Sequence, residues 1–437
     1  MSEFIFCRAL LQKIRCHFVF FGLIALLSSG LAEAVELKYS PIALGPYLEL
    51  VRQNNAYING ASLDVQTSMA NKEAQSLYQF SPSVSYNRGA YQNQTPYSSY
   101  STPESSTYGL SFTIEGWGKR GAREKLAQAQ TDASAVQLEK VRTNVELKAL
   151  NTYIDTLRLG LMLKSYNEAL TKIKPLQVTT KTADSERFLT SYKNATEKDL
   201  AFSALNLLNY SGDALQDLPY PRGSLNFPAQ EYNVEELINR GQTQRMEVLS
   251  LQSAIDVADK NVDLAMKNRN VNVYPYIAQT RTPQYQYSNG ASYTIPASPR
   301  LATPDITLVN SGTTYAAQNS ISVGITIPIP INNYLQSADL VSTANQKLQY
   351  EMQLRDLKVQ IRIQVLQAFM QYTIARNMLL EAQGGYEDAV KYPNKSPILA
   401  IMDKRDKEGA LLDAQTNHLK ALVNLWRQSG NYSVPTL

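Results

Sequence analysis

A glycine-rich stretch is the first candidate for chemistry in this sequence. Residues 116–121 read G-W-G-K-R-G, the G-x-G-x-x-G spacing of a phosphate-cradling turn, between a predicted strand and a predicted helix. A dinucleotide site also needs a second strand soon after that helix, and none is predicted. We therefore interpret the stretch as a flexible joint. Trp117 suits a membrane interface, and Lys119, Arg120 and Arg123 suit lipid phosphates; an ordinary solvated loop is the alternative.

Other side chains that perform chemistry are scarce. Outside the segment 1–34, His418 is the one histidine, so a histidine pair for a metal ion or a catalytic triad is lacking there. We expect His418 on a helix surface. Cys7 and Cys16 both lie within the segment 1–34, which leaves the rest of the chain without thiolates. No nucleophile motif, P-loop or catalytic carboxylate pair stands out, so we expect neither an enzyme nor a cofactor.

The segment 1–34 has the pattern of a secretory signal peptide. Three basic residues precede the apolar run 18–27, and Ala32-Glu33-Ala34 supplies a small-x-small cleavage site. No later stretch is long and apolar enough for a transmembrane helix, so entry into a membrane would require the strands of a closed barrel. The formal net charge of +4 does not indicate a nucleic-acid partner.

The remaining chain is predicted to contain two structural repeats, residues 35–220 and 221–437. Leu63-Asp64-Val65 of the first is echoed by Ile255-Asp256-Val257 of the second. Each repeat has the pattern of a helix, a strand, a polar loop, a second strand, a very long helix, a turn and a return helix. The sequence thus predicts a mainly α protein with some β, an elongated protomer built from an internal repeat.

The very long helices are predicted at 121–174 and 337–390. Both segments lack proline, and their apolar residues recur at alternating steps of three and four, as in coiled coils. Residues 359–365 also alternate as a strand would, but the length of the uninterrupted segment favours a helix. Each helix would be about 80 Å long, which a compact globular domain does not need.

Four strands are predicted at 83–91, 108–115, 276–287 and 320–327. Their lengths suit tilted strands that cross a bilayer, with a water-soluble hairpin as the alternative. The sequence has 27 tyrosines, and those in the strands fit either an aromatic girdle or a simple strand preference.

Two features of these elements require other copies of the chain. Four strands are too few for a membrane barrel, for which about eight is the lower limit. The apolar stripes of the two long helices are expected to have no other partner within one chain. Both needs predict an oligomer.

The order of elements resembles that of the TolC-like outer-membrane efflux protein family, over about Leu37 to Gly430. The marks of the resemblance are the prolines that end the ascending helices, a strand ending in I-T-I-P-I-P, and two segments of the last helix: Pro82, Pro275, 325–330, 398–403 and 422–430. The family's fold implies a homotrimer in which four strands per chain close a 12-stranded outer-membrane β-barrel. Below it, the long coiled-coil helices form an α-helical barrel through the periplasm.

The same resemblance implies a passive exit duct of a tripartite efflux or type I secretion system, coupled to an inner-membrane pump through a periplasmic adaptor. Drugs, metal ions and polypeptides all remain possible substrates. Asp403 corresponds to an acidic position near the family's periplasmic entrance, and Asp406 follows nearly a turn later. They would favour cations in a ring of three copies, whereas a solvated helix surface is the alternative. The tip turns at 174–180 and 392–397 lack the glycine that many members carry.

An exported structural or adhesive coiled-coil protein is the rival interpretation, with strands that form surface hairpins. It does not explain why a strand pair occurs at the same point of each repeat. A barrel closed by several copies does need that duplication.

Overall fold

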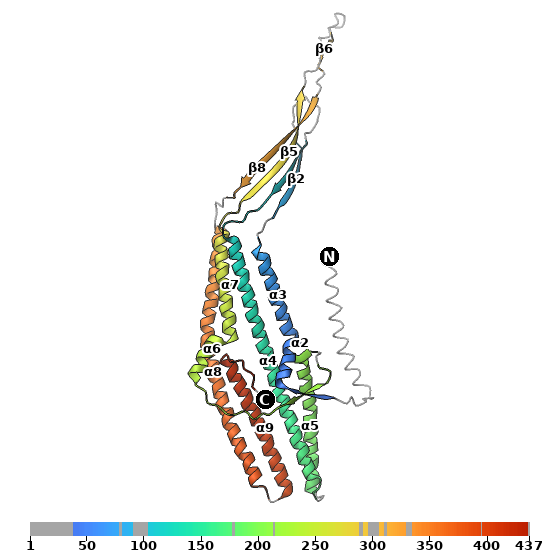
Figure 1. Ribbon diagram of the computed structural model, residues 1–437, viewed down its shortest axis with the longest axis vertical. Helices are drawn as coiled ribbons and strands as arrows, with labels where there is room; N and C mark the ends of the chain where they lie inside the picture. Colours follow the sequence, from blue (N-terminus) through green and yellow to red (C-terminus); the bar gives the residue numbers. More distant parts are fainter. Residues whose placement is uncertain are drawn as a thin grey trace, which may run out of the picture.

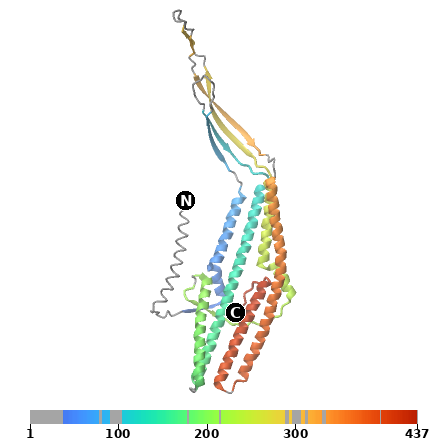
Figure 2. The same ribbon diagram turned by 180° about the vertical axis from the view of Figure 1, so that it is seen from behind.

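The computed structural model is a long, narrow molecule with a sheet at one end and helices along the rest (Figures 1 and 2). It describes residues 38–77, 81–90, 104–176, 180–212, 215–287, 292–295, 306–309, 313–328, 334–394 and 396–435. The predicted signal peptide, residues 1–34, lies outside the described residues. Most described residues are helical, as predicted.

Two helices run along nearly the whole helical part. They are α4 (Lys119–Ile173) and α8 (Tyr334–Lys391), with 55 and 58 residues. Each spans about 80 Å at 1.5 Å per residue. The return helices α5 (Thr180–Ser211) and α9 (Pro397–Gln428) lie beside their lower halves.

The ascending helix of each half is broken into two. In the first half, α2 (Leu44–Asn54) and α3 (Ala56–Ser76) are separated by the extended residue Asn55. The Asn55 side chain caps α3 by accepting a hydrogen bond from the Tyr57 amide at 3.0 Å. In the second half, extended Arg245 separates α6 (Val234–Gln244) from α7 (Met246–Asn268). The prediction of one continuous helix is therefore wrong in both halves.

The long strands form one antiparallel sheet in the order β2-β3-β5-β8. Its strands are β2 (Ser83–Ala90), β3 (Glu104–Ser111), β5 (Tyr274–Tyr287) and β8 (Thr313–Thr326). The boundaries predicted at 108–115 and 320–327 were wrong, because β3 already begins at Glu104 and β8 at Thr313. Those extensions are polar and resemble loops in sequence, yet their backbones pair with neighbouring strands.

Two smaller strand pairings are not predicted from the sequence. The strands β1 (Tyr39–Ala43) and β4 (Leu218–Arg222) pair in parallel near the middle of the molecule. The predicted boundary between repeats at 220 and 221 falls inside β4. A short hairpin, β6 (Ser292–Ile295) with β7 (Ile306–Val309), lies in the segment that was expected to be a polar loop.

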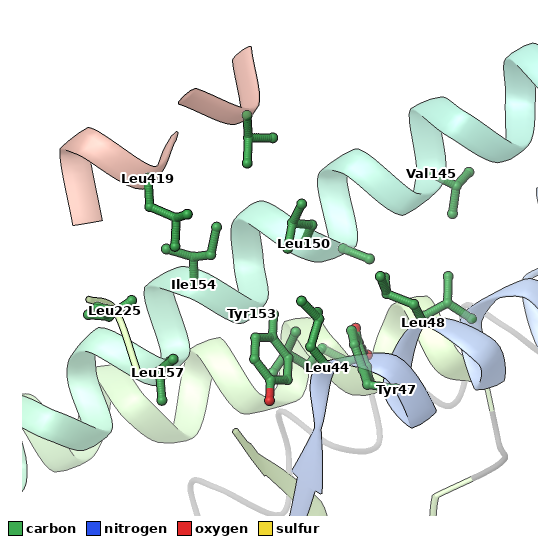
Figure 3. Packing of buried hydrophobic residues seen from close by; sticks show 14 of the residues in the cluster. Leu44, Tyr47, Leu48, Val145, Leu150, Tyr153, Ile154, Leu157, Leu225 and Leu419 are labelled. Atoms are coloured by element: carbon green, nitrogen blue, oxygen red, sulfur yellow. Dashed lines mark hydrogen bonds between the residues drawn. The ribbon is translucent and has the colours of Figure 1, made fainter. Parts of the chain in front are cut away.

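The main core lies where α2, α4, α5 and α9 meet around β1 and β4 (Figure 3). Leu150, Ile154 and Leu157 of α4 are at most 4% exposed in this core. The expectation that the apolar stripe of this long helix lacks a partner within the chain is therefore wrong. Here α2 and the return helices α5 and α9 cover the stripe.

Helix α8 has apolar residues on two opposite faces. One face packs into the chain through Ile361, Val365, Ala368 and Tyr372, all at most 2% exposed. The opposite face, here called the α8 stripe, is exposed and consists of Val341, Leu348, Met352, Val359, Ile363, Leu366, Met370 and Ile374. Because a helix turns by about 100° per residue, residues two apart lie on opposite sides, which explains the strand-like alternation at 359–365.

Candidate functional site

One face of the four-stranded sheet is apolar and exposed. Val84 and Tyr86 of β2 point to the same side, because side chains alternate along a strand, and the register sets them opposite Leu110 and Tyr108 of β3. The rings of Tyr86 and Tyr108 lie 5.0 Å apart. The register continues this apolar sheet face across β5 and β8, and its apolar members are Val84, Tyr86, Tyr108, Leu110, Ile277, Ile321, Val323 and Ile325. All except Leu110 are exposed.

The opposite face of the same sheet carries hydroxyl and amide groups. The Thr107 and Thr280 hydroxyls lie 3.1 Å apart across β3 and β5, and the Ser83 and Ser111 hydroxyls are also hydrogen-bonded. The polar residues of this polar sheet face are Ser83, Ser85, Asn87, Thr107, Ser111, Thr280, Ser320 and Ser322, and Tyr276 and Ala278 lie on the same face. The two faces of the sheet therefore differ in polarity, the pattern that strands of a membrane barrel have.

Glycines shape the joint between sheet and helices. A side chain at position 116 would put its Cβ 2.8 Å from the carbonyl oxygens of Asn270 and Val271, so the backbones approach too closely for any other residue. Gly118 adopts φ of 79°, in the left-handed region, directly before α4. These contacts account for the first two glycines of the 116–121 motif through local backbone geometry, whereas a side chain at Gly121 would meet open space.

The cations of the joint contact the chain itself. Lys119 Nζ donates to Asn272 Oδ1 at 2.8 Å, and Arg120 Nε donates to the Ser76 carbonyl oxygen at 2.7 Å. Trp117 is 92% exposed, and its position at a membrane interface stays a prediction.

Arg123, near the start of α4, also contacts a residue of the joint. It forms an ion pair with Glu115 at 2.6 Å, and both side chains are largely buried. Several side chains thus hold the joint in place by contacts within the chain. The predicted contact of its cations with lipid phosphates stays a prediction.

The predicted entrance residues lie near the opposite end of the molecule, within the first turns of α9. Asp403 and Asp406 are both exposed. Arg405 between them contacts Asp406 at 2.9 Å and stacks its guanidinium over the Tyr166 ring of α4, 3.8 Å from the ring centre. A ring of carboxylates needs more than one copy of the chain, so the charge filter stays a prediction.

The long strands and the longer helices lie side by side from one lateral edge of the molecule to the other. The sheet order is β2-β3-β5-β8, the upper helices follow as α3-α4-α7-α8, and the lower helices as α5-α4-α9-α8 (Figures 1 and 2). The same two edges are therefore open at every level. One edge consists of β2, α3 and α5, and the other of β8 and α8.

Both open edges expose apolar side chains. The α8 stripe runs along one edge. The other edge exposes Tyr57, Leu63 and Met69 on α3, and Phe188, Tyr192, Phe202 and Leu205 on α5. Apolar stripes of this length on both edges are typical of surfaces that another chain covers.

His418 is fully buried, so its predicted position on a helix surface is wrong. Its ring packs at 5.3 Å from the Tyr372 ring, between α9 and α8. Neither ring nitrogen has a hydrogen-bond partner among the described residues. Burial, and then the positive charge of Arg376, lower the pKa of His418. The residue type of His418 suggested a surface position, but a neutral imidazole can pack in a core like an apolar ring.

The buried imidazole should make the protein less stable in acid. Below about pH 6.5 the unfolded chain protonates at His418, whereas the native state resists protonation. The free energy of unfolding therefore decreases as the pH is lowered. We expect His418→Leu to remove this part of the acid sensitivity, and to stabilise the protein near neutral pH by relieving an unsatisfied polar group. Thermal unfolding of both proteins at about pH 7 and pH 5 measures this. An equal loss of stability on acidification in both would contradict the assignment.

The part of the chain that the structure describes has no helix long and apolar enough to cross a membrane. In the same residues, no group of three or more histidine, cysteine, aspartate and glutamate side chains is arranged to hold a metal ion.

Solved structures with this architecture include outer-membrane channels. The Campylobacter jejuni CmeC outer membrane channel matches with a TM-score of 0.57 and 15% identity, over 90% of this chain and 87% of that one. The outer membrane protein VceC of Vibrio cholerae matches with a TM-score of 0.58 and 12% identity, over 89% and 96%. The outer-membrane channel OprN matches with a TM-score of 0.61 and 13% identity, over 89% and 90%.

No protein-family model matches the sequence, and no curated protein sequence matches it either. The likeness is therefore one of fold. The chain has the fold of these outer-membrane proteins, the TolC-like fold that the order of elements in the sequence resembles.

Proposed function

We propose that the chain is an outer-membrane channel that acts as a passive exit duct. Three copies close a 12-stranded β-barrel in the outer membrane and an α-helical tube that extends into the periplasm. A periplasmic adaptor couples the tube to an inner-membrane pump, in a tripartite efflux or type I secretion system. The chain performs no catalysis and needs no cofactor.

The observation that carries this proposal is the two-faced sheet. Its apolar sheet face suits lipid, and its polar sheet face suits a water-filled lumen. A single sheet of four strands leaves the backbone groups of β2 and β8 unpaired at its edges, which is not tolerated in hydrocarbon. Closing the sheet with further copies removes both edges.

The open lateral edges support a ring of copies. Because β2 and β8 run in opposite directions, β8 of one copy can pair antiparallel with β2 of the next. This pairing also sets α8 beside the α3 and α5 of the neighbour, so that the apolar stripes of both edges cover each other. One head-to-tail contact, repeated around a closed ring, therefore pairs the strand edges and covers the apolar stripes of both the upper and the lower helices.

Electron microscopy of the protein extracted from outer membranes in mild detergent tests the architecture. A threefold tube about 100 Å long or longer is expected from the helix lengths. The rival proposal, an exported structural or adhesive coiled-coil protein, predicts compact monomers or solid rods released without detergent, and either would overturn the channel.

The entrance carboxylates should make the duct prefer cations. Three copies of Asp403 and Asp406 would place a ring of negative charge near the periplasmic end of the tube. We expect Asp403→Ala combined with Asp406→Ala to lower the cation-to-anion permeability ratio severalfold, measured by reversal potentials in planar bilayers. Asp64→Ala, at an exposed acid in the middle of α3 and away from the α9 tip, should leave the ratio unchanged. An unaltered ratio in the double variant would leave these acids as solvated surface residues.

The helical tips are where we propose that the adaptor binds. The turns connect α4 to α5 and α8 to α9, and both lack the glycine common in related channels. Crosslinkers placed at Lys174 and Tyr392 should capture the adaptor in the periplasm and so identify the transport system.

A further inference from the structure

Two arginines share one rung of the four-stranded sheet, that is, one row of residues that pair across neighbouring strands. The strands β2, β3, β5 and β8 contain three charged residues, Arg88, Glu104 and Arg281. Arg88 pairs with Ser106 of β3, and Ser106 pairs in turn with Arg281 of β5. Residues directly opposite each other point to the same face of a sheet. Both arginines and the serine between them therefore lie on one face.

That face is the apolar one. Arg88 is two residues beyond Tyr86, and Arg281 is four residues beyond Ile277, so all four belong to the apolar sheet face. Both arginines are exposed. A charge that faces lipid is costly at the centre of a bilayer and tolerated only near its borders. The position of this rung along the strands therefore decides what the arginines meet.

The rung lies at the outer border of the apolar band. From Ile114, next to the joint, to Ser106 the strand advances by about 27 Å, or about 20 Å in height at the usual tilt. This height is close to that of a membrane apolar band, about 25 Å. The Tyr86 and Tyr108 rings lie one rung before the arginines, where aromatic girdles occur. If the joint faces the periplasm, as in the proposed function, the arginines lie at the outer-leaflet headgroups.

The geometry of the rung suits a phosphate group. Neighbouring strands are about 4.8 Å apart, so the two arginines flank Ser106 at about 10 Å between their Cα atoms. Two guanidinium forks and a hydroxyl can then converge on one phosphate, each guanidinium donating two parallel hydrogen bonds. Glu104 precedes Ser106 by two residues on β3, and the charges of Arg88, Arg281 and Glu104 add up to a net positive charge.

We infer that Arg88, Ser106 and Arg281 form a binding site for the phosphate of an outer-leaflet lipid headgroup, one site per copy of the chain. The inference rests on the proposed function, because that function sets which end of the sheet faces outward. It assigns a ligand class to a part of the barrel surface that the transport activity does not require.

Native mass spectrometry of the detergent-solubilised oligomer tests the site. The probe is short-chain phosphatidic acid, compared with the diacylglycerol of the same chains and with inorganic phosphate. We expect retention of phosphatidic acid but not of diacylglycerol. Arg88→Gln and Arg281→Gln should each weaken retention about tenfold, and the double variant more. Glu104→Gln should strengthen it, and Arg187→Gln, at an exposed arginine of α5, should not change it.

The outcomes separate this site from the channel itself. Unchanged retention in the double variant, with a threefold tube still visible by electron microscopy, overturns the site and leaves the channel. Competition by inorganic phosphate at equal concentration overturns the lipid as the ligand. Where the double variant does not assemble, the single variants and Glu104→Gln decide by the same criteria. A wild-type protein without a threefold tube overturns both proposals.

Discussion

Replacing Ile363 and Met370 of α8 by aspartate together is expected to leave folded monomers but no detergent-stable trimer. Both side chains lie in the α8 stripe and are 52% and 63% exposed in the single chain, so the isolated fold does not need them. In the proposed ring the neighbouring copy buries them, and an unpaired charge there costs about 3–5 kcal/mol at each interface. Because every interface of the ring carries the same change, assembly and conductance should both be lost.

Circular dichroism and size-exclusion chromatography in mild detergent distinguish a loss of assembly from unfolding of the monomer. The helical signal should be retained while the oligomer peak moves to the monomer position. Gln353→Asp is the matched control, since Gln353 is an exposed residue of α8 that lies outside the stripe. A double variant that still runs as the wild-type oligomer would show that α8 is not the contact surface.

Truncating Tyr153 to alanine should cause the second large loss, this time within the chain. The ring is completely buried in the main core (Figure 3), and burial raises the pKa of its hydroxyl to about 12. That hydroxyl lies 2.9 Å from the Ile42 carbonyl oxygen of β1 and accepts a hydrogen bond from the Arg222 amide of β4 at 3.1 Å. Tyr153 thus fastens the parallel strand pair onto α4.

We expect Tyr153→Ala to lower the free energy of unfolding by about 3–5 kcal/mol, through the cavity and the lost hydrogen bonds. Tyr153→Phe keeps the ring and removes only the hydroxyl, so it should cost about 1–3 kcal/mol. Denaturant unfolding followed by the helical signal measures both. Tyr392→Ala, at a 69% exposed tip residue, should change stability by no more than about 0.5 kcal/mol. Equal effects of the alanine and phenylalanine variants would rule out packing as the main contribution.

The sequence was informative where a pattern is local and long. An uninterrupted segment without proline predicts a long helix from propensity alone, and α4 and α8 begin and end within a few residues of the predicted bounds. Short breaks were missed at Asn55 and Arg245, because a single extended residue leaves the apolar period almost unchanged. Polar strand extensions were missed because backbone pairing, and not side-chain hydrophobicity, determines them.

The sequence by itself determined the class of fold, with two very long helices, two strand pairs and a surplus of apolar stripes. The tertiary structure decided which stripes are covered. It buries the stripe of α4 and exposes the α8 stripe, although the two have the same spacing in sequence, because α2 and the return helices pack on one long helix and not on the outer face of the other. It also decided that His418 is a core residue and that Arg88 and Arg281 share one rung. Strand register and packing partners depend on contacts between distant segments, which local periodicity does not encode.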